Sequence, residues 1–181
     1  MKPTGIIRRV DDLGRIVIPK EIRNSLFITE GTPMEINITE DMEILLKKNN
    51  IMQSINDLSE KMCNLLYEML NHPVLITDEE KVLNCVGVSK KQYQNRELSN
   101  EILKIIHNSA NYTASDEFST TLLPIISKDE IKFKSQIIIP IILEGKSIGL
   151  IISLIYEGVP TNIDTKIMQT VSKIITMQLS N

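Results

Sequence analysis

The chain has no tryptophan and only two cysteines among its 181 residues. Cys63 and Cys85 are 22 positions apart, with no CxxC spacing and no nearby histidine. This pattern favours two reduced thiols in a cytosolic protein over a disulfide or a metal site. The amino terminus has no apolar signal region, and no apolar run reaches the roughly 18 residues that a membrane helix needs. We therefore expect a soluble cytoplasmic protein with no membrane partner, no metal and no other cofactor.

Charge is distributed unevenly along a chain whose net charge is −3. Residues 1–23 contain six basic and three acidic side chains, so this segment carries +3 and the remainder carries −6. The six basic residues are Lys2, Arg8, Arg9, Arg15, Lys20 and Arg23. A basic end on an acidic protein predicts a localised site for a polyanion.

Residues 1–48 have the pattern of a small β-rich unit. "GIIRRV" and "RIVI" are strand-like, and "DDLG" joins them with Gly14 able to adopt the positive φ of a tight hairpin loop. Pro19 suits the first turn of a short helix. "PMEINIT" then alternates apolar and polar residues, and "EILLKK" closes the unit. Because so short a segment buries little core, we expect an obligate dimer whose strands complete a shared core.

The arginines of this unit admit two interpretations. If "DDLG" places Val10 opposite Arg15, then Arg8 and Arg15 share one face of the hairpin, with Arg23 on the helix that follows. Guanidinium groups fit phosphates and guanine edges through paired hydrogen bonds, which predicts DNA binding. The alternative is exposed ion pairs of little energetic value. The available carboxylates are Asp11, Asp12 and Glu21. Spacing alone leaves the two interpretations close.

Residues 51–70 form an apolar heptad pattern with spacings of 4, 3, 4, 3 and 4. Its members are Ile51, Ile55, Leu58, Met62, Leu65 and Met69. Such a helix is typical of oligomerisation. An ordinary amphipathic helix packed on its own domain is an equally good interpretation, and the two roles can coexist.

Residues 73–181 predict an α/β unit (α+β) with an antiparallel sheet. We expect a hairpin at "PVLITDEEKVLNCVG", a helix at "RELSNEILKIIH", a loop over residues 108–119 and a strand at "STTLLPII". The hairpin "SQIIIPIILEGKSIGLIISLIY" follows, and then a last helix with one apolar face: Ile163, Ile167, Val171, Ile174 and Ile175. Since the second hairpin is apolar on both faces, both must be covered, one by helices and the other by loops, a partner or a ligand. A dry subunit contact is slightly favoured over a ligand pocket.

Catalytic chemistry is not indicated. His72 and His107 each end a predicted helix and have neither a nucleophile nor a metal ligand at useful spacing. Gly145 and Gly149 belong to a turn and a strand, so they do not form a phosphate loop. We therefore expect a binding protein and not an enzyme.

The stretch "TGIIRRVDDLGRIVIPKEIRNSLFITEGTPMEINI" resembles the AbrB-type swapped-hairpin DNA-binding module, over residues 1–48. The TGI opening, the D-x-LGR-x-VIP turn and the E-I-R helix carry the resemblance. It implies that two chains interlock through swapped hairpins and present a basic surface to double-stranded DNA. The DNA-binding residues we assign are Arg8, Arg9, Arg15, Lys20 and Arg23.

The order of module, helix and α/β domain resembles the stage V sporulation protein T (SpoVT) family of endospore-forming bacteria, whose C-terminal half is GAF-like. The resemblance implies a transcription factor of the forespore that activates and represses genes. It also implies a tetramer in which helices flanking the GAF-like domains, at residues 51–70 and 161–180, join two swapped-hairpin dimers.

The expected organisation is therefore a DNA-binding domain at residues 1–50, a linker or oligomerisation helix at 51–72 and a GAF-like regulatory domain at 73–181. The last of these would serve oligomerisation or the sensing of a small ligand of unidentified chemistry. The alternative function is an antitoxin-type protein-interaction module.

Overall fold

The computed structural model describes residues 5–48, 56–127 and 129–179. They divide into two compact units, residues 1–49 and 50–181, which are called the N-terminal and the C-terminal unit below. The N-terminal unit contains α1 (Lys20–Ser25), β1 (Met34–Ile38) and β2 (Ile44–Lys48). β1 and β2 form the predicted antiparallel pair, with Ile38 opposite Ile44. The heptad positions Ile51 and Ile55 lie outside the described residues.

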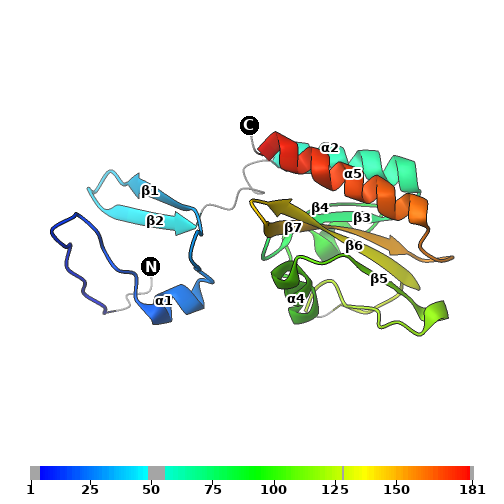
Figure 1. Cartoon of the computed structure of the whole chain (residues 1–181), viewed down its shortest axis with the longest axis horizontal. Helices are drawn as coiled ribbons and strands as arrows, with labels where there is room; N and C mark the ends of the chain where they lie inside the picture. The colour runs from blue at the N-terminus through cyan, green and yellow to red at the C-terminus, as the bar shows by residue number, and fades with distance from the viewer. Residues whose placement is uncertain (1–4, 49–55, 128, 180–181) are drawn as a thin grey trace. The chain divides into compact units, whose positions relative to one another are not determined.

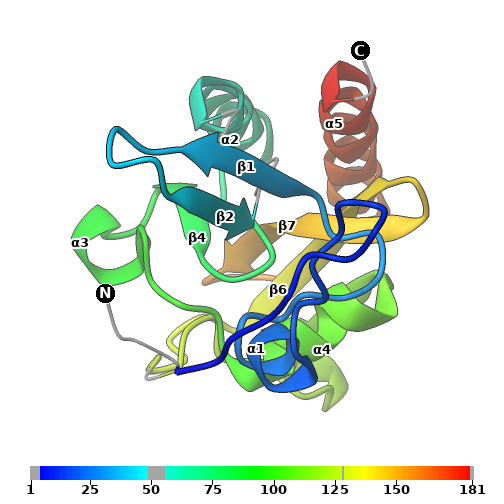
Figure 2. The same ribbon diagram turned by 90° about the vertical axis from the view of Figure 1, so that its left-hand side faces the viewer.

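The segment ahead of α1 makes the predicted turn without the predicted strands. Within residues 5–19 the chain is extended but unpaired, and Figure 2 shows this dark blue segment as an open loop, whereas β1 and β2 form a paired ribbon. The Asp11 N–H donates to the Arg15 carbonyl (3.0 Å), and the Gly14 N–H donates to the Asp11 carbonyl (3.1 Å). Gly14 takes a φ of 76°, as the last residue of a three-residue loop requires.

This turn corrects the predicted register. The loop holds three residues, so Asp11 faces Arg15, whereas the sequence interpretation placed Val10 there. A shift of one position reverses the face of every side chain on one strand. If alternation continues along both segments, Arg15 shares its face with Arg9 and not with Arg8.

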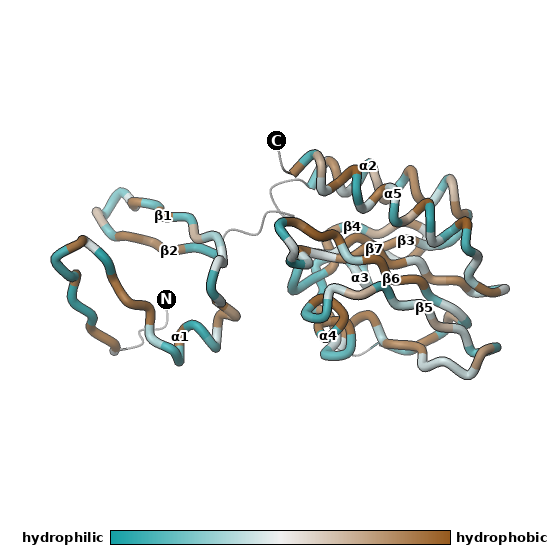
Figure 3. The backbone as a smooth tube through the Cα atoms, viewed as in Figure 1, coloured by the Kyte–Doolittle hydropathy of each residue, from teal (hydrophilic) through white to brown (hydrophobic). Residues whose placement is uncertain are grey.

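The N-terminal unit buries almost none of its apolar side chains. Pro19 is the only buried residue among residues 5–48. Fourteen large apolar side chains are exposed, and Figure 3 shows apolar stretches along the extended segment and along β2. They are Ile6, Ile7, Val10, Leu13, Ile16, Val17, Leu26, Phe27, Ile36, Ile38, Met42, Ile44, Leu45 and Leu46. The apolar face predicted for β1 is therefore present, but a single chain does not cover it.

The C-terminal unit is built on a five-stranded antiparallel sheet with helices on both faces. Its strands are β3 (Val74–Thr77), β4 (Val82–Val86), β5 (Tyr112–Ser115), β6 (Ser135–Leu143) and β7 (Lys146–Ile155), in the order β4-β3-β7-β6-β5. Its helices are α2 (Asn56–Leu70), α3 (Lys90–Tyr93), α4 (Asn100–Asn108) and α5 (Asn162–Leu179), with a 3₁₀ turn at Asp116–Phe118. In Figure 1, α2 and α5 lie side by side over one face of the sheet, and α4 lies on the other.

The apolar hairpin β6–β7 is covered on both faces by the chain itself. Ile139 and Ile151 pack in the core under α2 and α5. Ile138 and Ile152 pack on the opposite face, in a core closed by α4 and by residues of the irregular segment 119–133. These side chains are 0–2% exposed. Of the covers expected for the second face, loops are present together with α4, and the favoured subunit contact is wrong.

Two further predictions for this unit are wrong. The polar segment 108–119 contains β5, an edge strand that pairs only with β6, and "STTLLPII" forms no strand. The apolar side chains of "STTLLPII" cover the sheet, since Ile125 is fully buried. Within that stretch only Ile126 forms an isolated bridge. On α5, Val171 and Ile175 are buried as expected, but Ile163 is 70% exposed. Met168 and Ser172 complete the inward face.

Helix α2 packs on its own unit, as one of the two interpretations expected. Its inward residues are Ser59, Cys63, Leu66 and Leu70, all buried. Burial raises the pKa of the Cys63 thiol to about 12, and the thiol donates to the Val74 carbonyl at 3.2 Å. Two of the predicted heptad residues, Leu65 and Met69, remain 39% and 53% exposed. One stripe of the helix therefore packs against its own unit, and a neighbouring apolar stripe remains exposed.

Candidate nucleic-acid interface

The five predicted DNA-binding residues follow one another along a short exposed path. Arg8 and Arg9 lie on the extended segment before the turn, and Arg15 directly follows it. Lys20 is the first residue of α1 and Arg23 lies in its last turn. Pro19 at the N-cap has a φ of −56°, so its ring suits the start of the helix. All five side chains belong to exposed residues.

Asp11 organises the turn that presents Arg15. Its Oδ1 accepts hydrogen bonds from the backbone N–H of Leu13 (3.0 Å) and of Arg15 (2.8 Å). Its Oδ2 accepts a bond from the Arg15 Nε at 2.8 Å. The Arg15 backbone bond and then the Arg15 side-chain bond hold the pKa of Asp11 below its ordinary value. One carboxylate thus fixes both the backbone of the loop and the direction of the guanidinium group.

The ion-pair interpretation holds for Arg15 but not for the other cations. The Asp11–Arg15 pair is exposed, with side chains 36% and 68% accessible, so it contributes little to stability. It engages the Nε alone, and a guanidinium has four further N–H donors for an anion. Within the described part of the chain, no carboxylate forms an ion pair with the four remaining cations. These are Arg8, Arg9, Lys20 and Arg23.

The cations stand among the exposed apolar residues of the N-terminal unit. Ile7 and Val10 flank Arg8 and Arg9, and Ile16 follows Arg15. Ile7 is 87% exposed and Ile16 is 50% exposed. Apolar side chains need a covering surface, whereas the guanidinium groups need an anion. The same segment therefore has groups for two kinds of partner, an apolar surface and an anion.

A second group of cations, in the C-terminal unit, was missed by the sequence interpretation. Lys90, Lys91 and Arg96 line one shallow hollow together with Gln94 and Asn95. A signal was present, because the stretch 82–96 contains no acidic residue within a unit that is acidic overall.

One carboxylate of the C-terminal unit is buried. Asp78, after β3, is 0% exposed, and its Oδ1 accepts bonds from the backbone N–H of Glu80 and of Lys81, both at 2.7 Å. Its Oδ2 is buried without a hydrogen-bond partner among the described residues. Burial raises the pKa of Asp78, against the opposing effect of the two backbone bonds.

None of the described helices is both long and apolar enough to cross a membrane.

Comparisons with known proteins cover almost the whole chain. A family model described as stage V sporulation protein T C-terminal, transcription factor, matches residues 54–180, and one described as antidote-toxin recognition MazE, bacterial antitoxin, matches residues 7–53. Stage V sporulation protein T of Bacillus subtilis (strain 168) is 35% identical over 179 residues, covering 99% of each chain. Transition state regulatory protein AbrB of the same strain is 54% identical over 48 residues, which is 26% of this chain and 49% of that protein.

A solved structure with the fold of the C-terminal unit is the GAF domain of a phosphoenolpyruvate-protein phosphotransferase from Acinetobacter. Its TM-score is 0.57 at 13% identity, over 72% of this chain and 88% of that one. At this identity the likeness concerns the fold alone. It identifies the five-stranded sheet with its two helical layers as a GAF-like domain.

Proposed function

The chain belongs to the stage V sporulation protein T family, and from this premise we propose that it is a sporulation transcription regulator that binds double-stranded DNA through its N-terminal unit. The observation that carries the proposal is the set of cations around the Asp11–Arg15 turn. Arg8, Arg9, Lys20 and Arg23 are exposed and have no ion pair within the described residues, and Arg15 is held by Asp11 with most of its donors available. A phosphate backbone is the polyanion that such a cluster fits.

The N-terminal unit is proposed to act as a dimer of swapped hairpins. Fourteen exposed large apolar residues within 44 described ones leave a single copy without a core. Fully burying one such side chain stabilises a protein by about 1.5–3 kcal/mol. Two copies that cover each other's extended segments would supply this energy, and they would place two arginine clusters on one surface. Family membership supports this arrangement.

A tetramer is proposed to form through α2 and α5. The two helices lie side by side on the C-terminal unit (Figure 1), and each retains exposed apolar residues. Leu65 and Met69 are exposed on α2, and Ile163 and Met177 on α5. Pairing this layer with that of another dimer would cover these side chains and join two DNA-binding units.

The proposed organisation is a DNA-binding domain at residues 1–50, a linker helix that also oligomerises at 51–72 and a GAF-like regulatory domain at 73–181. The GAF-like domain would tune DNA binding through assembly or a small ligand. We place the activity in the cytoplasm of the forespore, where the protein would both activate and repress genes. Family membership favours a regulator over an enzyme.

A second candidate, an antitoxin-type protein-interaction module, has the match over residues 7–53 in its favour. The related antitoxin-type modules are expected to use an extended tail. Here the residues after the module fold instead into a sheet with two helical layers. The candidate therefore remains second.

The test is a salt-series fluorescence anisotropy titration of promoter-length duplex with the full chain. If a dimer makes about six to eight arginine–phosphate contacts, the slope of log K against log[salt] is roughly −5 to −7. Arg15→Ala is expected to abolish specific binding and to reduce the slope by about 2 per dimer. Arg15→Lys keeps the charge without the paired hydrogen bonds, so it should recover only part of the affinity.

Lys104→Ala is a matched control, since it removes an exposed cation from α4 in the other unit. Size-exclusion chromatography checks that Arg15→Ala leaves the oligomer intact. Retention of native affinity by Arg15→Ala at physiological salt would refute the assignment of Arg15. Absence of binding by the native chain at moderate salt would favour the protein-interaction module instead.

A further inference from the structure

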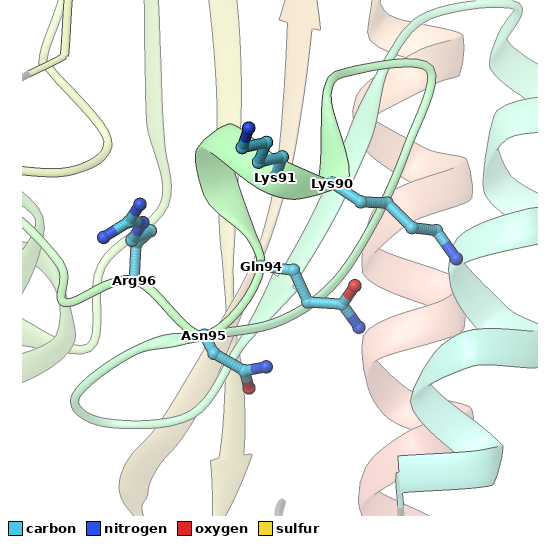
Figure 4. A pocket seen from close by; sticks show the side chains of 5 residues that line it. All are labelled: Lys90, Lys91, Gln94, Asn95 and Arg96. Atoms are coloured by element: carbon cyan, nitrogen blue, oxygen red, sulfur yellow. The ribbon is translucent and has the colours of Figure 1, made fainter.

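A shallow hollow on the C-terminal unit collects three cations and no carboxylate. Its volume is about 430 Å³, and it is lined by Lys90, Lys91, Gln94, Asn95 and Arg96. Figure 4 shows that Lys90 and Gln94 extend toward the long helices, whereas Lys91 lies over the short helix α3 and Arg96 stands on the side away from the long helices. The hollow lies outside both packed cores of the sheet, because none of the five residues belongs to either apolar cluster.

The backbone that carries these side chains is fixed to the edge of the sheet. The Asn95 N–H donates to the Val82 carbonyl (2.8 Å), and the Val82 N–H donates to the Arg96 carbonyl (3.0 Å). The Arg96 N–H closes a turn onto Tyr93 (3.1 Å), and Asn95 takes a φ of 60° that asparagine tolerates. The cations are thus presented from an ordered turn, and binding an anion there would not require ordering a loop.

Side-chain hydrogen bonds also hold the same turn in place. Tyr93 is 4% exposed, and its hydroxyl donates to the two Asp129 oxygens at 2.9 and 3.2 Å. The Gln94 Nε2 donates to the Leu83 carbonyl (3.2 Å) and to the Asn84 Oδ1 (3.3 Å). Asp129 is the carboxylate that faces α3 from the covering segment, and its oxygens are already engaged by hydrogen-bond donors. Within the described residues, Asp129 forms no ion pair with Lys90, Lys91 or Arg96.

The remaining carboxylates nearby do little to balance the three positive charges. The Lys90 Nζ lies 3.8 Å from the Glu60 Oε1 on α2, and both side chains are more than half exposed. Glu97 follows Arg96 and forms a backbone bridge with Lys81. Within the described residues, neither Lys91 nor Arg96 forms an ion pair. Like charges that line one hollow repel one another, and an anion bound there would offset this repulsion.

We propose that this hollow binds a phosphate group. A guanidinium offers paired hydrogen bonds to phosphate oxygens, and two ammonium groups add point charges that neutralise a dianion. The phosphate can come from a free phosphorylated compound or from the backbone of DNA. The inference goes beyond DNA binding by the N-terminal unit and does not depend on it.

The first arm of the test is isothermal titration calorimetry of inorganic pyrophosphate into the full chain. Lys91→Ala/Arg96→Ala should weaken pyrophosphate binding about tenfold or more, since it removes two of the three cations and their charge-assisted hydrogen bonds. Lys104→Ala/Lys134→Ala removes the same charge from exposed positions outside the hollow and should leave binding unchanged. Lys91→Gln/Arg96→Gln keeps the bulk of the side chains, and equal thermal unfolding midpoints exclude misfolding.

The second arm measures DNA affinity against salt for the same variants. If the hollow binds free phosphorylated compounds, Lys91→Ala/Arg96→Ala loses pyrophosphate binding while its DNA affinity stays native. If it binds the DNA backbone, DNA affinity falls, the salt slope flattens by about 2 for each hollow engaged, and pyrophosphate competes with DNA. Either result supports a phosphate site and identifies the source.

Lysines beside an edge strand also prevent sheets from joining edge to edge, which needs no anion. The proposal is overturned if pyrophosphate binding and the DNA salt slope of Lys91→Ala/Arg96→Ala both match those of Lys104→Ala/Lys134→Ala. Because the calorimetry needs no DNA, a failure of DNA binding by the N-terminal arginines would leave this result interpretable.

Discussion

The two units of this chain bury their apolar residues to opposite extents. In the N-terminal unit, Pro19 alone is buried among the described residues, and β1 exposes Ile36 and Ile38 at 67% and 74%. In the C-terminal unit, the sheet carries a packed core on each face, with side chains such as Ile138 and Ile151 fully buried. Both units are rich in β-branched residues, so composition does not cause the difference. The C-terminal unit covers its sheet with its own helices, whereas the N-terminal unit lacks a covering layer.

This contrast indicates which unit is stable alone. A sheet with two helical layers has the architecture of an independent domain. A segment of some fifty residues with no disulfide and one short helix usually needs a second chain. The N-terminal unit should therefore fold only together with a second chain, so its folding depends on protein concentration. The C-terminal unit should fold as a single copy, with any dependence on concentration limited to the proposed contact through α2 and α5.

The largest expected effect comes from a charge on the uncovered face of β1. Ile36→Glu should prevent association of the N-terminal unit, because an unpaired carboxylate buried in a dimer core costs several kcal/mol. DNA binding should be lost with it, since the two arginine clusters would no longer be joined. Analytical ultracentrifugation and anisotropy measure the two losses.

Phe118→Glu is the matched control for Ile36→Glu, because Phe118 is 64% exposed in the C-terminal unit, close to the 67% of Ile36. It should change neither the mass of the assembly nor the DNA affinity. If both variants behave alike, exposure in the single chain does not mark an interface and the contrast between the units loses its meaning.

A smaller effect is expected in the core of the C-terminal unit. Leu66 on α2 is fully buried beside Val171 and Ile175 of α5 in one apolar core. Leu66→Ala should lower the free energy of unfolding by about 2–5 kcal/mol through the cavity it leaves. Chemical denaturation should give the same loss at low and at high protein concentration. A loss that disappears on dilution would mean that this core, too, is completed by another chain.

The sequence predicted best those elements that are determined by local pattern. The hairpins β3–β4 and β6–β7, the helices α4 and α5, and the turn at Gly14 follow from apolar runs bounded by turn residues, from helical periodicity and capping residues, and from positive φ. The predictions were wrong where tertiary packing determines whether a segment forms a strand. The apolar run at residues 121–126 covers a sheet face instead of pairing, and the polar β5 pairs because it lies at an edge.

The candidate site was predictable in part for a similar reason. The composition of residues 1–23 indicated a cationic site, but the loop length that sets the register was not readable, so Asp11 and not Val10 faces Arg15. The hollow at Lys90, Lys91 and Arg96 depends on a turn held by Val82 and Tyr93, contacts that no local pattern encodes.

The buried carboxylate of Asp78 is expected to change the free energy of unfolding by on the order of 1 kcal/mol. The pH dependence of that free energy tests this expectation. Its pKa is raised in the folded protein above the ordinary 3.8, so its contribution to stability is fully present below that value. The contribution is lost as the pH rises through the folded pKa. Asp78→Asn keeps an oxygen for the Glu80 and Lys81 N–H groups and removes this loss. At neutral pH it should be at least as stable as the native chain, with a flatter dependence of stability on pH.

Asp78→Ala separates charge from hydrogen bonding, because it removes the acceptor of both backbone bonds. It should be less stable than the native chain at every pH. A native pH dependence in Asp78→Asn would place the titrating group elsewhere. Since Asp78 belongs to the C-terminal unit, neither variant should alter association of the N-terminal unit.

The smallest expected effect is at Asp11, the exposed carboxylate of the N-terminal turn. Asp11→Asn retains an Oδ1 for the Leu13 and Arg15 backbone N–H groups but loses the acceptor for the Arg15 Nε. Because exposed ion pairs are weak, DNA affinity should change by less than about fivefold. The pKa of Asp11 is lowered in the folded protein, so its contribution is present above 3.8 and fades only as the pH falls through the folded pKa.

The outcome at Asp11 is informative because the residue touches Arg15 and carries the wrong charge for DNA. A loss as large as that of Arg15→Ala would mean that binding depends on the direction of the guanidinium group, which Asp11 sets. A gain in affinity with a steeper salt slope would mean that the carboxylate mainly repels phosphates. A change within the expected range leaves Asp11 as a residue of the turn, whose backbone bonds asparagine reproduces. Anisotropy titrations of Asp11→Asn and Arg15→Ala on one duplex distinguish the three.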